Sequence, residues 1–531
     1  MFHTLKARAA AAAITAGALL ATVALATPQA ASAIGPQLVP LAIQAPETSG
    51  ATTGKTVLPA ACTAPSPDPS GHTKVYPDFH CYTAQQILAA YGVDQLHNEG
   101  TMGQGQTIVL VDAYGSPTAA ADLQHFHDVF FPSLPNPNFD QVFPQGAPDY
   151  NNTAHGKGQS GPNGAAGWSG EATLDIEWSY AIAPLAHIVL LAVPAAETEG
   201  VQGFPNLFNA MSWAIDNYPA GTIFSQSFGV TEQTFGGAQQ TQTARFDAVY
   251  KKAAAKGDTM LASSGDNGTL GVNKQKKDTG TYSFPTVGWP ASSPYLSAVG
   301  GTQLQYGWTW APTSDVPFNA DGSDNPAYFN WTEGGNSEAV WNESWLPAAS
   351  GGGPSAIYSR PAYQSEQASI IGSNARGVPD LSWNAAVNGG VLVWITAFPN
   401  YQRPGWHVYG GTSAASPQVA GVIALANQKL ADGGSSKRVG LLNPWLYQLG
   451  NTAGSSTSAF NGTGDFRDIV PQTYGIYTLK NNTDGANADG STPAGTPDGW
   501  PTLNGWDMTT GFGSPRAPAF VSDLVAAVLA G

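Results

Sequence analysis

The run Thr107–Asp112 (TIVLVD) is apolar between its two ends and shows no alternation of apolar and polar residues. A strand buried on both faces of a parallel sheet has this character. Four further runs share it: Ile188–Val193, Thr222–Ser227, Met260–Ser264 and Val391–Thr396. Helical stretches lie between them: Thr118–Phe131, Glu171–Ala183, Leu207–Asn217 and Thr241–Lys256. This succession predicts one large α/β domain, a doubly wound parallel sheet flanked by helices, with ligands at the carboxyl ends of the strands.

The N-terminus has the pattern of a secretory signal peptide. Lys6 and Arg8 precede the run Ala9–Ala26, which is dominated by Ala, Leu, Ile and Val, and Ala31–Ala33 is a small-x-small cleavage site. A single membrane anchor is the alternative, but the run is rich in alanine rather than leucine. We therefore predict residues 1–33 as a signal peptide and a mature protein that is secreted, extracellular and free of the membrane.

Composition agrees with an exported protein. The chain has 37 acidic and 21 basic residues, so its formal net charge is −16, and no basic patch suits nucleic acid. Cys62 and Cys81 are its two cysteines, and a single disulfide is the economical expectation outside the cell. Residues 34–81 are rich in Pro, Ser and Thr and are predicted to be an irregular arm before the domain at 82–531. The polar insertion Thr473–Asn504 is predicted to be a surface loop.

A candidate nucleophile lies late in the chain, in Gly410–Pro417 (GGTSAASP), just before the helical run Val419–Leu430. A serine between small residues at the start of a helix has an exposed hydroxyl, and the backbone amides there face a developing anion. Ser413 is that serine. The alternative is a Gly/Ser/Ala turn that only caps the helix.

Two carboxyl groups could serve this serine. Glu171 and Asp175 are four residues apart and therefore share one face of the predicted helix. Two stacked carboxylates repel each other when both are ionised, but they can share a proton, one acting as base and the other orienting it. The alternative is an acidic first turn that is favoured by the helix dipole.

A third carboxyl group follows a predicted strand in Leu261–Gly268 (LASSGDNG), where Asp266 would lie at the carboxyl end of the sheet. The alternative is an ordinary turn, since Asp and Asn tolerate left-handed backbone geometry. A carboxyl group stabilises an oxyanion only as the neutral acid, because the ionised group would repel the charge.

Together the strings G-T-S-A-A-S-P, E-x-x-L-D-I-E and S-S-G-D-x-G resemble the sedolisins, the serine-carboxyl peptidases of the subtilisin-like clan. The resemblance runs from about Tyr82 to Pro515. It implies a subtilisin-like fold and a serine-type peptidase, endo-acting or tripeptide-removing, that works at acid pH on polypeptides. Ser413 would be the nucleophile, Glu171 the base, Asp175 its partner and Asp266 the oxyanion-hole acid. Glu177 is expected to be a surface or structural carboxylate, and the protein to be a monomer.

The resemblance also implies two binding features. Ser225–Gly229 (SQSFG) resembles the family segment that lines the substrate cleft, where an extended peptide could add as a strand; the alternative is a strand-end turn. One structural Ca²⁺ is expected, bound by the side chains of Asp468 and Asp507, since oxygen ligands suit this ion. The carbonyl groups would come from three residues: Ile469, Leu503 and Gly505. Leu503 stands where the family has glycine, and surface-turn aspartates are the alternative.

One departure leaves two other interpretations open. Sedolisins carry a long propeptide domain between signal and catalytic domain, and residues 34–81 are too few for one. The first alternative is a secreted binding protein that keeps the peptidase scaffold without turnover. The second is an ordinary Ser-His-Asp subtilisin that uses Asp112 and His155, although the string after His155 is a poor match to the subtilisin histidine helix.

Overall fold

The structure is a computed structural model of the 531-residue chain. It describes residues 39–40, 43–44, 80–150, 164–194, 204–273, 280–317, 319–320, 325–343, 345–346, 348–399, 404–483 and 498–531. The predicted signal peptide, Cys62 and His155 lie outside these residues. The predicted pairing of Cys62 with Cys81 therefore stays a prediction.

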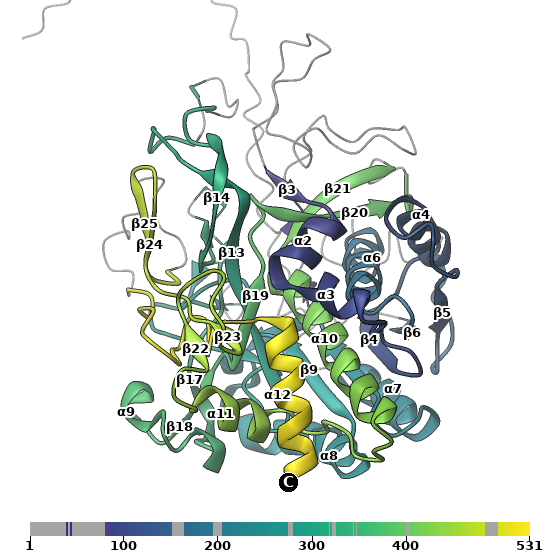
Figure 1. Ribbon diagram of the computed structural model, residues 1–531. Coiled ribbons are helices and arrows are strands. Elements are labelled where there is room, and N and C mark those ends of the chain that lie inside the picture. Colours follow the sequence, from purple (N-terminus) through teal and green to yellow (C-terminus); the bar gives the residue numbers. More distant parts are fainter. Residues whose placement is uncertain are drawn as a thin grey trace, which may run out of the picture. The chain divides into compact units, whose positions relative to one another are not determined.

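A central sheet of eight strands organises the described chain (Figure 1). Its order is β14-β13-β9-β7-β4-β6-β5, and β19 also pairs with β13. All pairings are parallel except that of β14 with β13. The strands are β4 (Thr107–Ala113), β5 (Asn138–Val142), β6 (His187–Val193), β7 (Ile223–Gln226), β9 (Thr259–Ser263), β13 (Ser297–Trp310), β14 (Trp331–Val340) and β19 (Leu381–Asn384). The predicted parallel α/β sheet is confirmed.

Alternate residues of β4 point into two separate cores. Ile108 and Leu110 belong to one buried cluster, whereas Val109 and Val111 belong to another. The first core is covered by α6 (Gly164–Ile182) and α10 (Thr412–Asp432), the second by α7 (Phe204–Asn217) and α8 (Gln239–Lys256). Because both faces are covered, the strand reads as a continuous apolar run.

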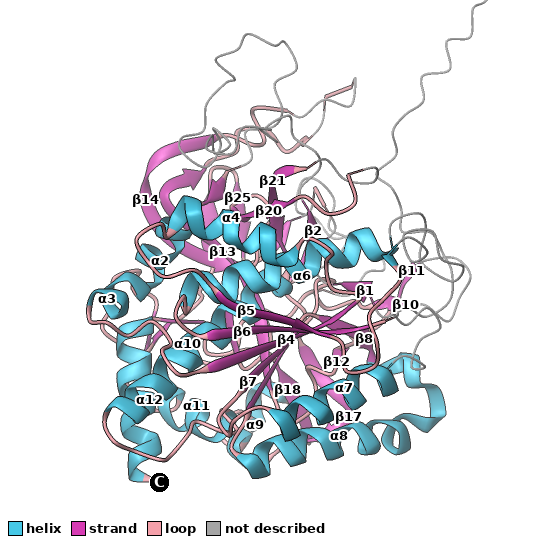
Figure 2. Cartoon of the chain, turned by 90° about the vertical axis from the view of Figure 1, so that its right-hand side faces the viewer, coloured by secondary structure: helices cyan, strands magenta, loops and turns pink. Residues whose placement is uncertain are grey.

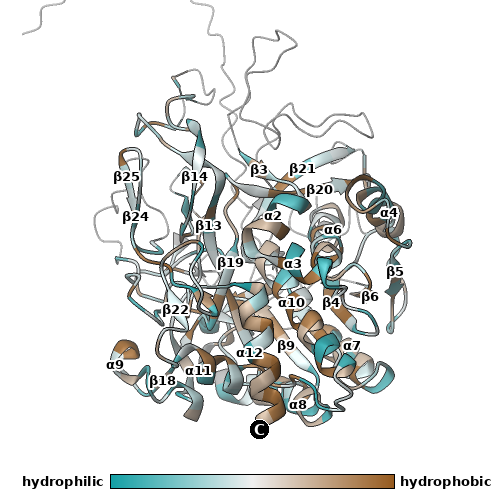
Figure 3. Ribbon diagram, in the orientation of Figure 1, coloured by the Kyte–Doolittle hydropathy of each residue, from teal (hydrophilic) through white to brown (hydrophobic). Residues whose placement is uncertain are grey.

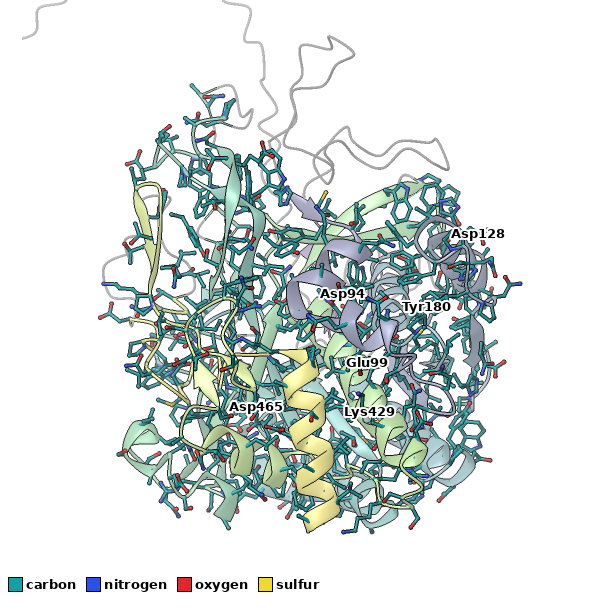
Figure 4. All side chains as sticks on the ribbon, in the orientation of Figure 1. Asp94, Glu99, Asp128, Tyr180, Lys429 and Asp465 are labelled. Carbon is teal, nitrogen blue, oxygen red and sulfur yellow. The ribbon has the colours of Figure 1, made fainter. Side chains whose placement is uncertain are left out.

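The remaining helices pack around the first core. They are α2 (Ala84–Tyr91), α3 (Val93–Asn98), α4 (Ala119–Phe130), α9 (Ala368–Ile371), α11 (Asn443–Gly450) and α12 (Ala517–Ala530). α12, which is strongly hydrophobic, packs against α10 (Figure 3). At the far end of α10, the Lys429 ammonium pairs with Glu99 at 2.8 Å (Figure 4). No helix of the described ranges is both long and apolar enough to cross a membrane.

The run Val391–Thr396 forms a strand, but its predicted place in the parallel sheet is wrong. It is β20 (Gly390–Ile395), in a separate sheet of order β2-β21-β20-β3, in which β2 is Ile43–Gln44. There it pairs antiparallel with β21 (Gly405–Gly410) and parallel with β3 (Cys81–Tyr82). Helices α4 and α6 cover β20. An apolar run reports burial on both faces and carries no information on which sheet the strand joins.

Two segments predicted to be irregular contain strands. In the insertion, β24 (Gln472–Tyr474) and β25 (Tyr477–Leu479) form a hairpin, so the prediction of a plain surface loop is wrong there. Its tyrosines are buried, and the Tyr477 ring stacks on Trp310 at 5.4 Å between centroids. Within residues 34–81, β1 (Val39–Pro40) and β2 (Ile43–Gln44) pair with strands of the domain.

Short strands complete the described chain. They are β8 (Phe228–Thr231), β10 (Val272–Asn273), β11 (Gly280–Thr281), β12 (Gly288–Trp289), β15 (Asn342–Glu343), β16 (Ala348–Ala349), β17 (Gly353–Ser359), β18 (Ala375–Val378), β22 (Ser456–Thr457), β23 (Phe466–Arg467) and β26 (Ser514–Pro515).

Candidate active site

Ser413 lies in the first turn of α10, directly after β21. Gly411 makes the turn between them with a φ of 96°, a left-handed value that favours glycine. The first amides of a helix have no partner within the helix, so this turn presents N–H groups beside the serine hydroxyl. The Ser413 side chain is fully buried.

Asp266 is bonded to this same turn. Its Oδ1 accepts hydrogen bonds from the Thr412 amide at 2.8 Å and from the Thr412 hydroxyl at 2.7 Å. The Ser263 hydroxyl, at the end of β9, donates to the Thr412 carbonyl at 2.9 Å. The carboxyl end of a central strand is thereby attached to the residue before Ser413.

The second oxygen of Asp266 has a different environment. Oδ2 is buried and has no hydrogen-bond partner among the described residues. Burial raises the pKa of Asp266 to about 7, and the Thr412 hydrogen bonds oppose this shift. Below that pH the group is a neutral acid. Since Oδ1 already accepts twice, Oδ2 is the oxygen suited to carry the proton.

Glu171 and Asp175 both lie on the predicted helix, α6, and both are fully buried. Asp175 Oδ1 accepts a hydrogen bond from the Ser227 hydroxyl at 2.9 Å. The pKa of Asp175 lies well above its usual range, chiefly because of burial and then because of the nearby Asp112 and Glu171 carboxyl groups. Three carboxyl groups therefore act on one another in this interior.

Close helix contact holds α6 and α10 together. A Cβ built on Gly421 of α10 would lie 2.5 Å from Cβ of Ile182 on α6, so only glycine fits between them. A Cβ on Gly170 would lie 2.4 Å from the Tyr409 hydroxyl. Burial, followed by the charges of Glu171 and Glu177, raises the pKa of Tyr409. Tyr409 on β21 thus packs against the helix that carries the carboxyl pair.

Sequence comparison identifies the family to which this arrangement belongs. The model of the subtilase family matches residues 121–446, more than half of the chain. The chain belongs to the subtilase family. Kumamolisin of Bacillus sp. (strain MN-32) is 30% identical over 437 residues, and the match covers 82% of this chain and 62% of kumamolisin. Tripeptidyl-peptidase 1 of Dictyostelium discoideum is 29% identical over 361 residues, 67% of this chain and 47% of that protein.

The fold of this subtilase agrees with that of a solved serine-carboxyl proteinase. Pseudomonas sedolisin, a serine-carboxyl proteinase complexed with two molecules of pseudo-iodotyrostatin, superposes with a TM-score of 0.56 at 23% identity. That match covers 85% of this chain and 98% of the sedolisin. The resemblance to the sedolisins is confirmed. The chain spans less than two thirds of the length of kumamolisin and of the Dictyostelium enzyme.

The structure connects Asp112 to the carboxyl pair. Asp112 lies near the end of β4, is fully buried, and burial raises its pKa to about 8. Its charge raises the pKa of Asp175. The sequence suggested Asp112 only for a Ser-His-Asp subtilisin with His155, which lies outside the described residues. The signal that could have found this contact is the position of Asp112 at the carboxyl end of a central strand.

Glu177 does not join this group. It is fully buried, and its Oε2 accepts a hydrogen bond from the Trp394 amide of β20 at 3.0 Å. Burial raises its pKa well above the usual range. The expectation of a structural role fits this contact, whereas a surface position is wrong.

A hollow of about 70 Å³ adjoins Asp266 between the end of β9 and the strands β8 and β12. Its lining is rich in glycine and includes Thr231, Ser264, Asp266, Gly288 and Gly351. A Cβ on Gly351 would lie 2.5 Å from the Ser264 carbonyl oxygen, so only glycine allows these two backbone segments to lie so close together. The predicted cleft segment divides at Ser227, between β7 and β8, and β8 forms one wall of the hollow.

The predicted calcium ligands lie around one loop. Asp468 Oδ2 accepts from the Gly505 amide and Asp507 Oδ2 from the Leu503 amide, both at 2.9 Å. Burial raises the pKa of each aspartate to about 6, and Asp468 Oδ1 is buried without a hydrogen-bond partner in the described chain. Ile469 is buried beside Asp468. A buried carboxylate oxygen without a partner, with a second buried aspartate bonded to the same loop, suits a cation that prefers oxygen ligands.

Sequence reasoning missed three residues that contact the site from other parts of the chain. Thr412 and Ser227 donate to Asp266 and Asp175, and Tyr409 packs against Gly170. Thr412 and Ser227 do stand inside the quoted strings, so their hydroxyl groups beside the candidate residues were the available signal. Tyr409 carries no comparable signal.

Proposed function

We propose that this subtilase is a secreted, acid-acting serine-carboxyl peptidase. The observation that carries the proposal is the buried Asp266 carboxyl group, bonded to Thr412 and so held next to Ser413. An acid in that position serves as an oxyanion donor only while it is protonated. Its pKa of about 7 keeps it protonated in acid.

The reaction is acyl transfer from a peptide bond. Glu171 takes the proton of the Ser413 hydroxyl as Oγ attacks the carbonyl carbon. The Asp266 proton and the Ser413 amide donate to the oxyanion that forms. The C–N bond breaks, the amine leaves with the proton, and water then cleaves the ester by the reverse steps. Asp175, held by Ser227, orients and tunes Glu171.

The acid requirement has two physical sources. Asp266 must keep its proton, and the buried group of Asp112, Glu171 and Asp175 is stable only when its carboxyl groups share protons instead of all being ionised. Burial and mutual repulsion raise the pKa of Asp175 accordingly. Activity is therefore expected to fall as pH rises through the neutral range.

The substrate is an extended polypeptide. Strand β8 pairs with β12 and with β1, and a substrate strand would take the place of β1 opposite Phe228 and Gly229. The hollow beside Asp266 offers space for a side chain next to the reacting carbonyl. Endopeptidase action is the first candidate. The Dictyostelium relative named tripeptidyl-peptidase 1 makes tripeptide removal the second, and product lengths distinguish the two.

The proposal includes a secreted monomer with one structural Ca²⁺ and one disulfide. Residues 1–33 would direct export, and Cys62 would pair with Cys81. Asp468 and Asp507 would bind the ion by side chain, and Ile469, Leu503 and Gly505 by carbonyl. The ion would neutralise two buried carboxylates and fix the loop after the insertion.

The test is hydrolysis of an unfolded protein by the purified chain, supplied with calcium, from about pH 2 to 9. Ser413→Ala and Glu171→Gln should abolish activity that wild type shows only in acid. Glu177→Gln is the matched control, a buried glutamate on the same helix whose role is structural, and it should keep the wild-type pH profile.

Two outcomes would contradict the proposal. A neutral optimum that survives Glu171→Gln would exclude glutamate as the base. Folded protein without activity at any pH would favour the alternative of a secreted binding protein on a peptidase scaffold.

A further inference from the structure

The loop that carries Asp266 lies along a second stretch of backbone. The loop comprises residues 264–269, directly after β9, and is called the Asp266 loop below. The Ala349 amide donates to the Asp266 carbonyl oxygen at 2.9 Å, and the Gly351 amide donates to the Gly265 carbonyl oxygen at 2.8 Å. Each bond joins the loop to the stretch that begins at the end of β16.

Asn482 contacts the Asp266 loop and this second stretch at the same time. It is a fully buried residue of the insertion and follows β25 closely. Its Nδ2 donates to the Ser350 carbonyl oxygen at 2.9 Å. Its own carbonyl oxygen accepts from the Thr269 amide at 3.1 Å. One residue therefore connects the end of the Asp266 loop with the middle of the stretch that lies along it.

The insertion fixes Asn482 in turn. Its Oδ1 accepts from the Trp500 amide at 2.7 Å, and its neighbour Asn481 pairs with Pro501 in an antiparallel bridge. The hairpin β24–β25, which precedes it, lies beside β13 and β14 (Figure 2). A backbone carbonyl group only accepts and a backbone amide only donates, so the two partners set the orientation of the Asn482 amide.

The second stretch is bonded on its other side to the central sheet. The Ser350 hydroxyl accepts from the Gly301 amide of β13 at 2.9 Å and donates to the Thr509 carbonyl oxygen at 2.7 Å. Both Ser350 and Gly301 are buried. Asn482 therefore connects the Asp266 loop to a stretch that a strand of the central sheet already holds.

The position of this loop matters for the reaction. The Asp266 carboxyl group is bonded to Thr412, while its backbone moves with the loop. A donor stabilises an oxyanion when it lies about 2.7–3.1 Å away. A displacement of about 1 Å, even from a distant change, can cost roughly 10²-fold in rate. Contacts that fix the loop therefore bear on turnover as well as on stability.

We propose that Asn482 is a positioning residue of the candidate active site. It holds the Asp266 loop where the Asp266 carboxyl group can donate to the oxyanion formed at Ser413. The inference rests on the proposed peptidase function. It gives a role in the reaction to a segment that the sequence predicts to be a surface loop.

The experiment is a double-mutant cycle between Asn482→Ala and Asp266→Ala in the full chain, supplied with calcium. Initial rates of hydrolysis of an unfolded protein at acid pH give kcat and KM, and Tm reports folding. Asn482→Ala should lower kcat by about 10- to 10²-fold in the wild-type chain. In Asp266→Ala it should lower kcat by less than about threefold, because the donor that it positions is already absent.

Asn427→Ala is the matched control. Asn427 is also fully buried, and its side chain makes the same pair of bonds to backbone. Its Nδ2 donates to the Gly221 carbonyl oxygen at 3.1 Å, and its Oδ1 accepts from the Val439 amide at 3.0 Å. Asn427→Ala should lower Tm as Asn482→Ala does, but should keep kcat within about threefold of wild type well below Tm.

A conservative variant should restore the function in acid. The neutral carboxyl group of Asn482→Asp can donate to Ser350 and accept from Trp500, as the amide does. This variant should therefore keep kcat within about threefold of wild type at acid pH. If Asn482→Ala does not fold, Asn482→Ser, whose side chain is too short to reach both partners, replaces it in the cycle.

Three results would overturn the inference while the proposed function stands. The first is a kcat of Asn482→Ala within threefold of wild type. The second is an equal loss in the wild-type and Asp266→Ala chains, since the effect would then not pass through Asp266. The third is an equal loss in Asn482→Asp and Asn482→Ala at acid pH. A wild-type chain that hydrolyses nothing at any pH would overturn both proposals.

Discussion

Two kinds of buried carboxyl group lie in this molecule. Those of the candidate active site have no basic partner: across the described ranges, no lysine or arginine forms an ion pair with Asp112, Asp175 or Asp266. Burial raises the pKa of Asp112 to about 8 and that of Asp266 to about 7, and raises that of Asp175 further with the help of its acidic neighbours.

Two other buried carboxylates, Asp380 and Glu338, are each matched with an arginine. Arg376 pairs with Asp380 at 2.5 Å, and both side chains are fully buried. Arg467 pairs with Glu338. The Tyr447 hydroxyl and the Ala298 amide also donate hydrogen bonds to the Asp380 carboxylate, each at 2.8 Å. Similar burial therefore serves two purposes: a scaffold carboxyl group is paired with an arginine, whereas a site carboxyl group without a cation is suited to hold a proton.

The largest effect should come from breaking a scaffold pair. Arg376→Met leaves the buried Asp380 carboxyl group without its cation, and should lower the free energy of unfolding by about 3–5 kcal/mol. Urea unfolding near neutral pH measures this loss. Lys252→Met, which removes the exposed ion pair with Asp216, should cost about 1 kcal/mol or less.

The same comparison predicts the opposite result at the site. Asp175→Asn should remove turnover but leave the free energy of unfolding in urea close to that of wild type. The substitution breaks no ion pair, because Asp175 has no cationic partner among the described residues. Equal losses of stability in Arg376→Met and Asp175→Asn would remove the distinction between the two kinds of carboxyl group.

Asp266 gives the next effect, on catalysis. Asp266→Ala removes one oxyanion donor and should lower kcat by roughly 10²- to 10³-fold. Asp266→Asn keeps a donor at every pH and should retain more activity. Wild type loses this donor as pH rises through about 7, whereas the asparagine variant does not. Profiles of kcat against pH that fall identically in wild type and Asp266→Asn would show that this proton is not required.

Much of the fold follows from local patterns in the sequence. β4 and β6 are continuous apolar runs because α6 and α7 cover opposite faces of their sheet. β20 shows the limit of this signal, since burial does not specify a partner strand. The β24–β25 hairpin was missed because Tyr474 and Tyr477 stand in a polar stretch, and what buries them is a distant tryptophan, Trp310.

The site is predictable where a motif is local, and less so where strands meet. Glu171, Asp175, Asp266 and Ser413 each lie in a short string whose spacing carries the chemistry. The proximity of Asp112 to Asp175 depends on strand β4 and helix α6 packing together. The pairing of Val39 with Gly229 joins residues far apart in sequence, and two-residue strands leave no periodic signal.

A smaller effect concerns stability against pH. The raised pKa of Asp112 means that its neutral form is favoured in the folded state, so stability is fully present below about pH 4 and is lost as pH rises through about 8. Asp112→Asn should match the Tm of wild type near pH 4 and exceed it near pH 8. Asp128→Asn, on the exposed side of α4, should change neither (Figure 4). A Tm for Asp112→Asn below that of wild type near pH 8 would contradict this assignment.

The smallest expected effect is stabilisation by calcium. A bound cation would be a third way to accommodate buried carboxylates, beside an arginine partner and a retained proton. Asp468 and Asp507 form no ion pair in the described part of the chain. Each accepts a hydrogen bond from a backbone amide of the same loop, that of Gly505 and that of Leu503. If a divalent cation neutralises them, calcium at about 100 times its Kd should stabilise the fold by about 2.7 kcal/mol, and chelation should lower Tm. Asp507→Asn should remove the response to calcium. Asp465→Asn, a buried neighbour that bonds Ser455 instead, should keep it. A Tm that changes with neither calcium nor chelator would contradict the cation site. Asp468 and Asp507 would then be carboxyl groups that hold protons, like those of the active site.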